Sequence, residues 1–430
     1  MNRVFFAVWE ADMDLKKRLE QRFLKYSAIS SQSDGSNDTI PSSIGQWKMA
    51  ETLAEDLKDL GVQDVEIGET GVVYGRLPER LSPGHKPVPK VGWCCHMDTV
   101  DVHLSPEVHA RVVREYPGGD VLQNEEKQIY IRESEHPELK DYIGQDIIVS
   151  DGTSVLGADN KAAVSNFMTA LEILKEAPEI EHGEIYVAFV PDEETGLRGS
   201  KSMDFSKFPV DFAYTIDCER EGEVVYQTFN AGEAVLTIKG VPAHPMSSKN
   251  NLVNPAMVAV DYINLLDRAE TPEHTEDTEG YIWVTDIITD SLNGKVMIDI
   301  RDHDLAKYKA KKAYLEKALE IIKMKHPRAE LSLEMKDIYG NIFDALNDDN
   351  TVCIDYLYEA LDELGIKART KAMRGGTDGS FISTQGIPTP NYFTGALNFH
   401  SSAEFLPMDP FEKSCLVTLK LIEIIARNRD

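Results

Sequence analysis

The stretch GEIYVAFVPDEETGL, residues 183–197, decides how the rest of this 430-residue chain is interpreted. Its apolar run, residues 185–190, predicts a buried central strand of an α/β sheet. The run gives way to three consecutive acids, Asp192, Glu193 and Glu194. An isolated acidic triplet is most often a surface turn. In an open α/β sheet, however, ligands bind where strands end, and carboxylates held together require a counter-charge, of which a metal ion is the strongest.

Two other apolar runs also end in a residue that can bind a metal ion. Residues 91–95 lead directly into His96, and residues 212–217 close with Asp217. Asp159 stands at the start of a predicted amphipathic helix, where an N-cap is the ordinary explanation for an aspartate. Three strands that each end in a carboxylate or an imidazole predict a site assembled along one edge of the sheet.

The types of residue in this set point to a pair of metal ions. The candidate ligands are His96, Asp159, Glu194, Asp217 and His400. Two imidazoles and three carboxylates suit two borderline divalent ions, Zn²⁺ above all, with Mn²⁺ or Co²⁺ as alternatives. If Asp159 bridges, each ion keeps one imidazole and one carboxylate of its own, and a water shared by the ions has a lowered pKa.

Two acids next to the ligands have predicted supporting roles. Asp98 lies two residues beyond His96 on an extended segment, so both point to the same side, and Asp98 can hold the second imidazole nitrogen. Glu193 and Glu194 diverge on an extended backbone, so one can bind metal while the other faces the substrate. A free carboxylate beside a metal-bound water is suited to act as a general base, which is the role predicted for Glu193.

The overall composition excludes several classes of partner. With 45 basic and 73 acidic residues the net charge is −28, which argues against nucleic acid and anionic membranes. The five cysteines form no CxxC pair, as expected of reduced thiols in a cytoplasmic protein. The N-terminal apolar run of six residues is too short for a signal peptide, and no segment approaches the roughly 18 apolar residues that span a bilayer.

The length of the chain predicts two domains. Residues 223–341 follow the order β-α-β-β-α-β, which is that of a ferredoxin-like domain. We therefore expect an α/β catalytic domain with a mixed central sheet, formed by residues 1–222 and 342–430, and interrupted by this smaller domain.

Two features of the N-terminal part can be compared directly with the structure. A helix is predicted over residues 44–60, with one apolar face formed by Ile44, Trp47, Leu53 and Leu57. Residues 101–150 are rich in charge, Pro and Gly, and predict an irregular surface excursion.

Seven motifs carry a resemblance to a known family. In chain order they are HMDTVD, LGADNKAA, PDEETGLRG, YTID, PAHP, RGGTDG and NYFTGALNFH. Together they resemble the M20 metallopeptidases, and within that family the tripeptide aminopeptidases, from about Met13 to the C-terminus. The resemblance implies a zinc-peptidase-like catalytic domain holding two zinc ions, a lid domain that forms a homodimer, and removal of the N-terminal residue from short peptides.

The resemblance also implies roles for individual residues. The same five ligands hold the metals, with Asp159 bridging and joined to Asn160 by a cis peptide; Glu193 is the base and Asp98 orients His96. Four further residues are implied in substrate binding: His244, which stabilises the oxyanion in its own or the partner's site; Arg301, which clamps the peptide's carboxylate; and Arg374 and Asp378, which line the cleft. Without the family, these four are interpreted as a loop imidazole, salt bridges and turn residues.

Two departures from the tripeptidase pattern leave the substrate open. The usual GADDK and HGKHEF are here GADNK and HSSAEF, the latter being residues 400–405. The change after His400 alters polar groups beside a ligand and therefore bears on substrate selection. The alternatives are another M20 amidohydrolase, namely a dipeptidase, a carboxypeptidase-type enzyme or an N-acyl amino acid deacylase. A non-catalytic metal-dependent binding protein would require loss of the base or the ligands, all of which are present.

Overall fold

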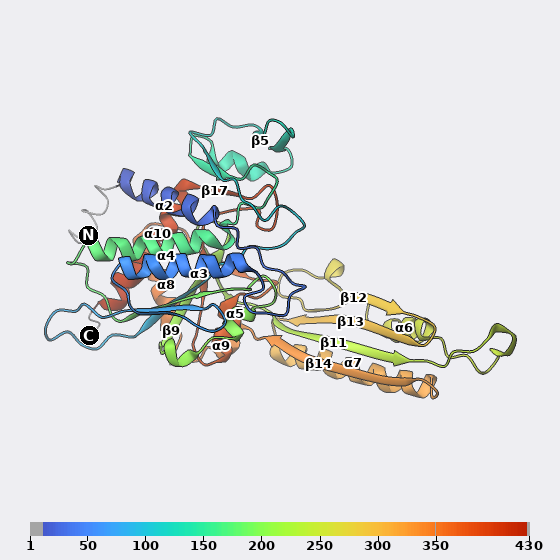
Figure 1. The fold of residues 1–430 in the computed structure, drawn as a ribbon. Helices are drawn as coiled ribbons and strands as arrows, with labels where there is room; N and C mark the ends of the chain where they lie inside the picture. The colour runs from blue at the N-terminus through green and yellow to red at the C-terminus, as the bar shows by residue number, and fades with distance from the viewer. Residues whose placement is uncertain (1–11, 349, 428–430) are drawn as a thin grey trace. The chain divides into compact units, whose positions relative to one another are not determined.

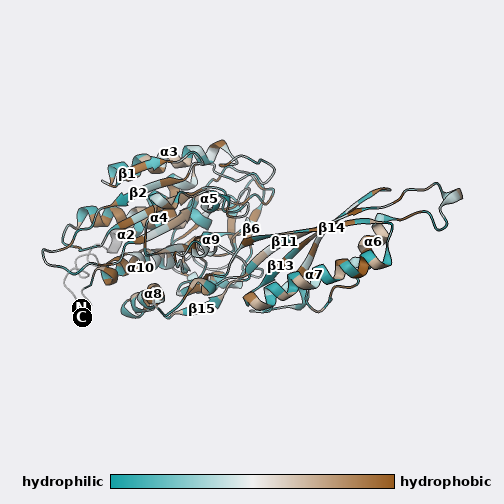
Figure 2. Cartoon of the chain, turned by 90° about the horizontal axis from the view of Figure 1, so that it is seen from below, coloured by the Kyte–Doolittle hydropathy of each residue, from teal (hydrophilic) through white to brown (hydrophobic). Residues whose placement is uncertain are grey.

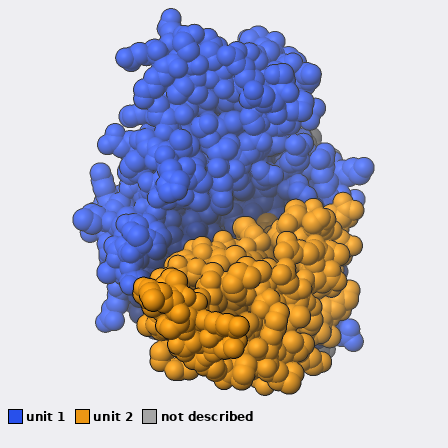
Figure 3. All heavy atoms as spheres, turned by 90° about the vertical axis from the view of Figure 1, so that its right-hand side faces the viewer, with its two compact units in different colours: residues 1–226, 346–371, 377–430 blue, residues 227–345, 372–376 orange. Residues whose placement is uncertain are grey.

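The computed structural model describes residues 12–348 and 350–427. The chain divides into two compact units, coloured separately in Figure 3. Unit 1 contains the residues up to Tyr226, residues 346–371 and the chain from Thr377 onward, and unit 2 contains residues 227–345 and 372–376. The predictions made for the first eleven residues lie outside the described residues.

Unit 1 is built on a sheet of eight strands. Their spatial order is β1 (Gln63–Ile67), β2 (Val73–Leu77), β8 (Ile185–Val190), β3 (Val91–His96), β9 (Phe212–Cys218), β16 (Asn391–Phe393), β10 (Glu223–Gln227) and β15 (Arg369–Ala372). The central strands β8, β3, β9 and β16 run parallel, whereas β2 and β10 pair antiparallel with their neighbours β8 and β16. The prediction of an α/β fold with a mixed central sheet is confirmed.

Helices cover both faces of this sheet because its central strands are apolar on both sides. One face carries α3 (Ile44–Asp59), α4 (Ala158–Glu176), α8 (Val352–Glu363) and α10 (Met408–Ala426), and α2 (Asp12–Ser27) packs on α4 and α10 (Figure 1). The other face carries α5 (Arg198–Lys201) and α9 (Asp378–Thr384). None of the described helices is long and apolar enough to cross a membrane.

The core under α4 is centred on Trp93. This side chain is fully buried on β3 and stacks on Phe167 of α4 with ring centroids 5.2 Å apart. Its indole N–H donates a hydrogen bond to the Tyr392 hydroxyl at 3.1 Å. A buried tryptophan with its polar atom satisfied fixes β3 against α4, and these two elements carry His96 and Asp159.

The apolar face predicted for residues 44–60 is only partly correct. Ile44 is 87% exposed and Trp47 is only half-buried. The buried residues of α3 are Gln46, Met49, Ala50, Leu53, Ala54 and Leu57. The first turn is oriented by the polar side chain of Gln46, which is bonded to Asp192 inside the protein, and a periodicity count of apolar residues does not include such a contact.

The segment 101–150 is more ordered than the sequence predicted. It contains β4 (Arg111–Val113), β5 (Val121–Asn124), β6 (Ile129–Ile131), the 3₁₀ helix η1 (Pro137–Tyr142) and β7 (Ile147–Val149). Strand β7 lies between β4 and β17 (Phe405–Pro407) in a three-stranded sheet. A small apolar cluster that includes Tyr116, Leu139 and Phe405 lies beneath it, so the predicted irregular excursion is a packed element joined to the strand that follows His400.

Unit 2 has four antiparallel strands and two helices. In chain order they are β11 (Asn230–Lys239), α6 (Pro255–Ile263), β12 (Tyr281–Thr289), β13 (Asn293–Asp302), α7 (Leu305–Lys325) and β14 (Glu330–Tyr339). The spatial order β12-β13-β11-β14 is that of a ferredoxin-like sheet. Both helices pack on this sheet, and hydrophilic and hydrophobic residues alternate along α7 (Figure 2).

The described residues also contain four further short 3₁₀ helices. They are η2 (Phe205–Lys207), η3 (Pro245–Ser247), η4 (Pro272–His274) and η5 (Ile342–Ala345). The N-cap of η3 is His244, one of the predicted substrate-binding residues, whose ring nitrogen accepts a hydrogen bond from the backbone N–H of Met246.

We expect Phe167→Ala to lower the free energy of unfolding by about 3–5 kcal/mol, because it removes the ring stacked on Trp93 and leaves a cavity. Urea unfolding followed by tryptophan fluorescence measures this loss. Ile44→Ala is the control, since a truncation at an exposed position should cost less than about 0.5 kcal/mol. Equal losses in the two variants would contradict the packing described here.

Candidate metal centre

The parallel strands of unit 1 bring the predicted ligands to one edge of the sheet. His96 is the last residue of β3, Asp217 lies near the end of β9, and Glu194 follows β8 after a turn. Because β8, β3 and β9 are neighbours and run in the same direction, their carboxyl ends meet. Asp159 comes from the start of α4, and His400 from the loop between β16 and β17.

The carboxylate of Asp159 lies between the two imidazoles. Its Oδ1 is 2.9 Å from His96 Nε2, and its Oδ2 is 3.0 Å from His400 Nε2. Glu194 Oε1 lies 3.0 Å from the same nitrogen of His400, and Asp217 Oδ1 lies 3.8 Å from His96 Nε2. The structure therefore brings all five predicted ligands together, and the peptide between Asp159 and Asn160 is cis.

The donor set fits divalent cations. A single imidazole nitrogen carries at most one proton, yet His400 Nε2 faces a carboxylate oxygen of Asp159 and one of Glu194 at the same distance. Ligand atoms of His96, Asp159 and Glu194 lie within 4.8 Å of one another. Carboxylates and imidazoles converging on shared points are the arrangement expected around borderline metal ions.

The electrostatics of the cluster lead to the same conclusion. Burial, followed by the charge of Asp159, raises the pKa of Glu194 to about 7 and that of Asp217 to about 6. Burial also raises the pKa of Glu193 well above its ordinary value. Although burial alone would lower the pKa of His400, its hydrogen bonds to Asp159 and Glu194 raise that pKa to about 11. So many acids in a buried site require added positive charge to be ionised together.

Asp98 contacts the cluster mainly through backbone groups. Its carboxylate accepts hydrogen bonds from the amides of Glu193 at 3.0 Å and Glu194 at 3.2 Å. His96 Nδ1 lies 3.2 Å from the carbonyl oxygen of Asp98 and 3.4 Å from its carboxylate. Asp98 therefore lies beside the second nitrogen of His96, as expected, and in addition it holds the backbone that carries the two glutamates.

Sequence reasoning missed the role of Asp192. Its buried carboxylate accepts hydrogen bonds from the Ser42 amide and from Gln46 Nε2, both at 2.8 Å, and from the Ser42 hydroxyl. Its own amide donates to Gln46 Oε1 at 2.9 Å. Asp192 therefore binds Ser42 and Gln46 inside the protein. Glu193 and Glu194 instead have the residues of the metal cluster as neighbours. The one available signal was Gln46, a polar residue within an otherwise apolar helix face.

The loop that carries His400 is supported by the excursion of residues 101–150. Its backbone has φ near 60° at His400, a conformation that non-glycine residues seldom adopt. Gln123 Nε2 donates to the carbonyl of Ser402 at 2.8 Å, and Asn398 Nδ2 lies 3.1 Å from His136 Nδ1. Because β17 also pairs with β7, this segment positions a candidate metal ligand.

Asp378 lies near the metal cluster in unit 1, whereas Arg301 makes its contacts within unit 2. Asp378 is buried at the start of α9, where burial raises its pKa to about 7 and its electrostatic neighbours include His96 and Asp217. In unit 2, Arg301 pairs with Asp299 at 3.0 Å and donates to the Gly232 carbonyl at 2.9 Å.

Arg374 binds a loop within unit 2. Its guanidinium donates to the Glu279 carbonyl and to the Thr275 hydroxyl, both at 2.8 Å. It also lies over the rings of Phe229 and Tyr281, at 5.3 and 5.4 Å from their centroids. These contacts give Arg374 a structural task in holding residues 275–279, whatever it contributes to substrate binding.

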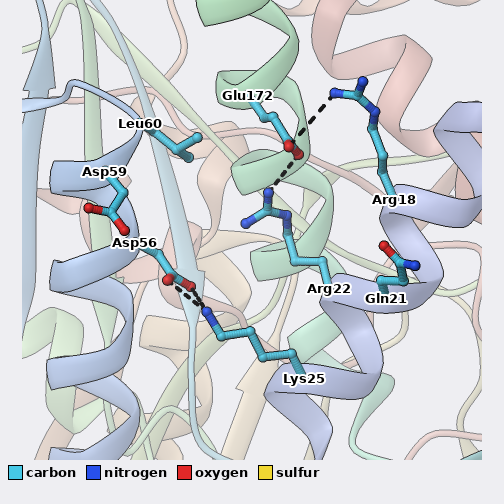
Figure 4. Close-up of a pocket in the computed structure, with 8 residues that line it drawn as sticks. All are labelled: Arg18, Gln21, Arg22, Lys25, Asp56, Asp59, Leu60 and Glu172. Atoms are coloured by element: carbon cyan, nitrogen blue, oxygen red, sulfur yellow. Dashed lines mark hydrogen bonds and ion pairs between the residues drawn. The ribbon is translucent and has the colours of Figure 1, made fainter.

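A separate pocket of about 330 Å³ opens between α2, α3 and α4 (Figure 4). Five of its charged side chains form ion pairs with one another: Lys25 with Asp56, and Arg18 and Arg22 with Glu172. Because these charges largely cancel, the pocket offers no concentrated charge to a ligand, and we assign the chemistry to the metal cluster.

Comparison with known proteins places this site in a family. The model of peptidase family M20/M25/M40 matches residues 157–424. A peptidase T-like protein of Yersinia pestis is 50% identical and covers 94% of this chain and 97% of its own. The peptidase T of Fusobacterium nucleatum is 39% identical and covers 96% of this chain and all of its own.

Two solved structures share the fold. The aminopeptidase PepT of Bacillus cereus is 20% identical, with a TM-score of 0.74 over 96% of this chain and 99% of its own. A tripeptidase of Staphylococcus aureus is 24% identical, with a TM-score of 0.75 over the same shares. A sheet edge that gathers acids and imidazoles suited to divalent ions, in a chain whose relatives are peptidases, indicates a metal-dependent hydrolase. The chain belongs to the M20/M25/M40 peptidase family, and the resemblance found in its motifs is confirmed.

We expect divalent ions to stabilise the chelator-treated protein, because a ligand that binds only the folded state adds about 4 kcal/mol at 1,000 times its Kd. Asp159→Asn should lose most of this gain, since it removes a charge shared by both histidines. Thermal melts with and without Zn²⁺ measure the effect. Asp211→Asn is the control, because Asp211 is an exposed acid whose carboxylate accepts a hydrogen bond from the backbone amide of Lys90. A full zinc-dependent gain in Asp159→Asn would contradict the assignment.

Proposed function

We propose that this chain is a metallo-aminopeptidase that removes the N-terminal residue from tripeptides with the help of two zinc ions. One observation carries the proposal: the buried carboxylate of Asp159 presents one oxygen to each of two imidazoles, with further carboxylates around them. The names of the relatives, peptidase T and tripeptidase, support the substrate class. The acidic composition and five unpaired, buried cysteines support a cytoplasmic location.

The proposed chemistry divides between the ions and this chain's own residues. When bound, the ions lower the pKa of a water and polarise the scissile carbonyl. Glu193 takes a proton from the attacking water and delivers it to the nitrogen of the leaving amine. Burial raises the pKa of Glu193, which is the direction in which a carboxylate is tuned to act as a general base near neutral pH. Asp98 holds the Glu193 amide, so the base stays beside the cluster.

Residues of unit 2 are proposed to bind the rest of the peptide. His244 is exposed at the N-cap of η3, where its imidazole can donate to the developing oxyanion. Arg301 is proposed to hold the peptide's terminal carboxylate, since a planar guanidinium offers two parallel donors. The roles of Arg374 and of Asp378, which belongs to unit 1, as residues that line the substrate cleft remain predictions.

We also propose that the protein is a homodimer formed through unit 2, which acts as a lid. Strand β12 is an edge of its sheet and exposes Trp283, Ile287 and Ile288, each by about half of its surface. An exposed apolar edge strand is a site for pairing with another chain.

We expect Ile288→Asp to shift the protein from dimer to monomer, because a charge at the apolar edge must be desolvated in the interface. Light scattering after size-exclusion chromatography measures the mass. Met324→Asp, at an exposed position on α7, is the control and should leave the mass unchanged. A wild-type monomer, or an unchanged dimer in Ile288→Asp, would rule out this interface.

The end of the substrate that is recognised distinguishes the proposal from its main alternative, another M20 amidohydrolase. An aminopeptidase needs a free amino group, whereas a deacylase prefers a blocked one. We expect turnover of free tripeptides and at least 100-fold slower turnover of their N-acetyl forms, measured by chromatography of the products. Faster cleavage of N-acetyl amino acids would instead favour the deacylase, and release of the C-terminal residue a carboxypeptidase-type enzyme.

We expect Glu193→Gln to lower kcat for a tripeptide by roughly 10²–10⁴-fold, the usual loss when a general base is removed. Its metal content, measured by atomic absorption, should match that of the wild type, because Glu193 is not assigned as a ligand. Full turnover in this variant would remove Glu193 from the mechanism and favour a base elsewhere.

A further inference from the structure

Glu404 is a buried carboxylate with an unusual set of partners. It is only 1% exposed, and its two oxygens accept three backbone hydrogen bonds from one short segment. Oε2 accepts from the amides of Leu156 at 2.7 Å and Gly157 at 2.8 Å, and Oε1 accepts from the amide of Asp159 at 3.0 Å. All three donors belong to the backbone that leads into α4 and ends at the central residue of the metal cluster.

These hydrogen bonds restrict Asp159 at its main chain, whereas the histidines contact its side chain. Glu404 follows His400 by four residues, so one loop holds both ends of Asp159: Glu404 binds its amide, and His400 contacts its Oδ2. Because side-chain position follows from backbone position, a shift of the 156–159 backbone would move both carboxylate oxygens away from their imidazoles.

Both carboxylate oxygens of Glu404 act as hydrogen-bond acceptors. Its three partners are all backbone N–H donors, which offset part of the burial that raises the pKa of Glu404 to about 8. Lys161 is fully buried nearby, donates to the Ile29 carbonyl at 2.6 Å, and interacts electrostatically with both Glu404 and Asp98. Asp98 and Glu404 thus hold two backbone segments of the cluster and share Lys161 as a buried neighbour.

We propose that Glu404 is a positioning residue of the metal centre. It holds the 156–159 backbone so that Asp159 presents one carboxylate oxygen to His96 and the other to His400. This rests on the proposed metal-dependent function. Glu404 itself is not assigned as a ligand of the metals or of the substrate. Such outer residues commonly change metal affinity or activity by 10–100-fold when mutated.

Glu404→Gln is the sharpest variant because it keeps the volume of the side chain. Its single carbonyl oxygen can serve either the pair of amides at Leu156 and Gly157 or the amide of Asp159. In both cases the NH₂ group is directed against an N–H donor. Glu223→Gln is the matched control: Glu223 is also buried, accepts from the Arg220 amide at 3.2 Å and from Lys371 at 3.1 Å, and neither partner belongs to the metal cluster.

Two measurements test the proposal on the full chain. The first is the Zn²⁺ dissociation constant by competition with a chromogenic chelator, together with the visible spectrum of the Co²⁺-loaded protein. We expect about 10–100-fold weaker binding and an altered Co²⁺ spectrum in Glu404→Gln, with wild-type values in Glu223→Gln. Wild-type affinity and spectrum in Glu404→Gln would overturn the proposal.

The second measurement needs neither metal nor a folded variant. Hydrogen exchange of the metal-free wild-type protein, followed by mass spectrometry of peptides covering residues 155–160, should show strong protection of these amides. Exchange as fast as that of an exposed loop would overturn the positioning role. A wild-type protein that binds no divalent ion but protects these amides would instead contradict the proposed function, so the two failures are distinguishable.

Discussion

The structure of unit 1 depends on holding several carboxylates close together in a buried place. Asp159, Glu194 and Asp217 surround His96 and His400 at distances of 2.9 to 3.8 Å, and the charge of Asp159 repels the carboxylates of Glu194 and Asp217. Without added positive charge, burial raises the pKa of two of these acids into the range of 6 to 7. Divalent cations relieve this repulsion, because each carboxylate is attracted to the positive charge that it binds.

The rest of the fold supplies the rigidity that such a cluster requires. Parallel strands bring three of the ligands to one sheet edge, and a stacked tryptophan fixes the strand of His96 to the helix of Asp159. Three other buried acids, Asp98, Asp192 and Glu404, bind no predicted metal; each instead accepts backbone hydrogen bonds. They fix the main chain that carries the predicted ligands. The buried acids of the site thus form two groups, one predicted to bind metal and one that holds the backbone.

The sequence predicted those parts of the site that coincide with the ends of apolar runs. His96 and Asp217 lie at the ends of buried strands and Glu194 follows one, and strand direction alone brings them together. Asp192 and Glu404 were missed because a carboxylate that accepts backbone amides has no local pattern. The face of α3 was misplaced because Gln46 turns inward to a partner 146 residues away. The excursion at 101–150 looked irregular because its strands are short and one of them, β7, pairs with β17 near the other end of the chain.

The central claim is that Asp159 bridges two ions, one on the side of each histidine. X-ray diffraction from zinc-loaded crystals, recorded above and below the zinc absorption edge, tests this claim most directly. The account predicts two anomalous peaks, one between Asp159 and His96 and the other between Asp159 and His400. A single peak, or zinc bound away from Asp159, would contradict it.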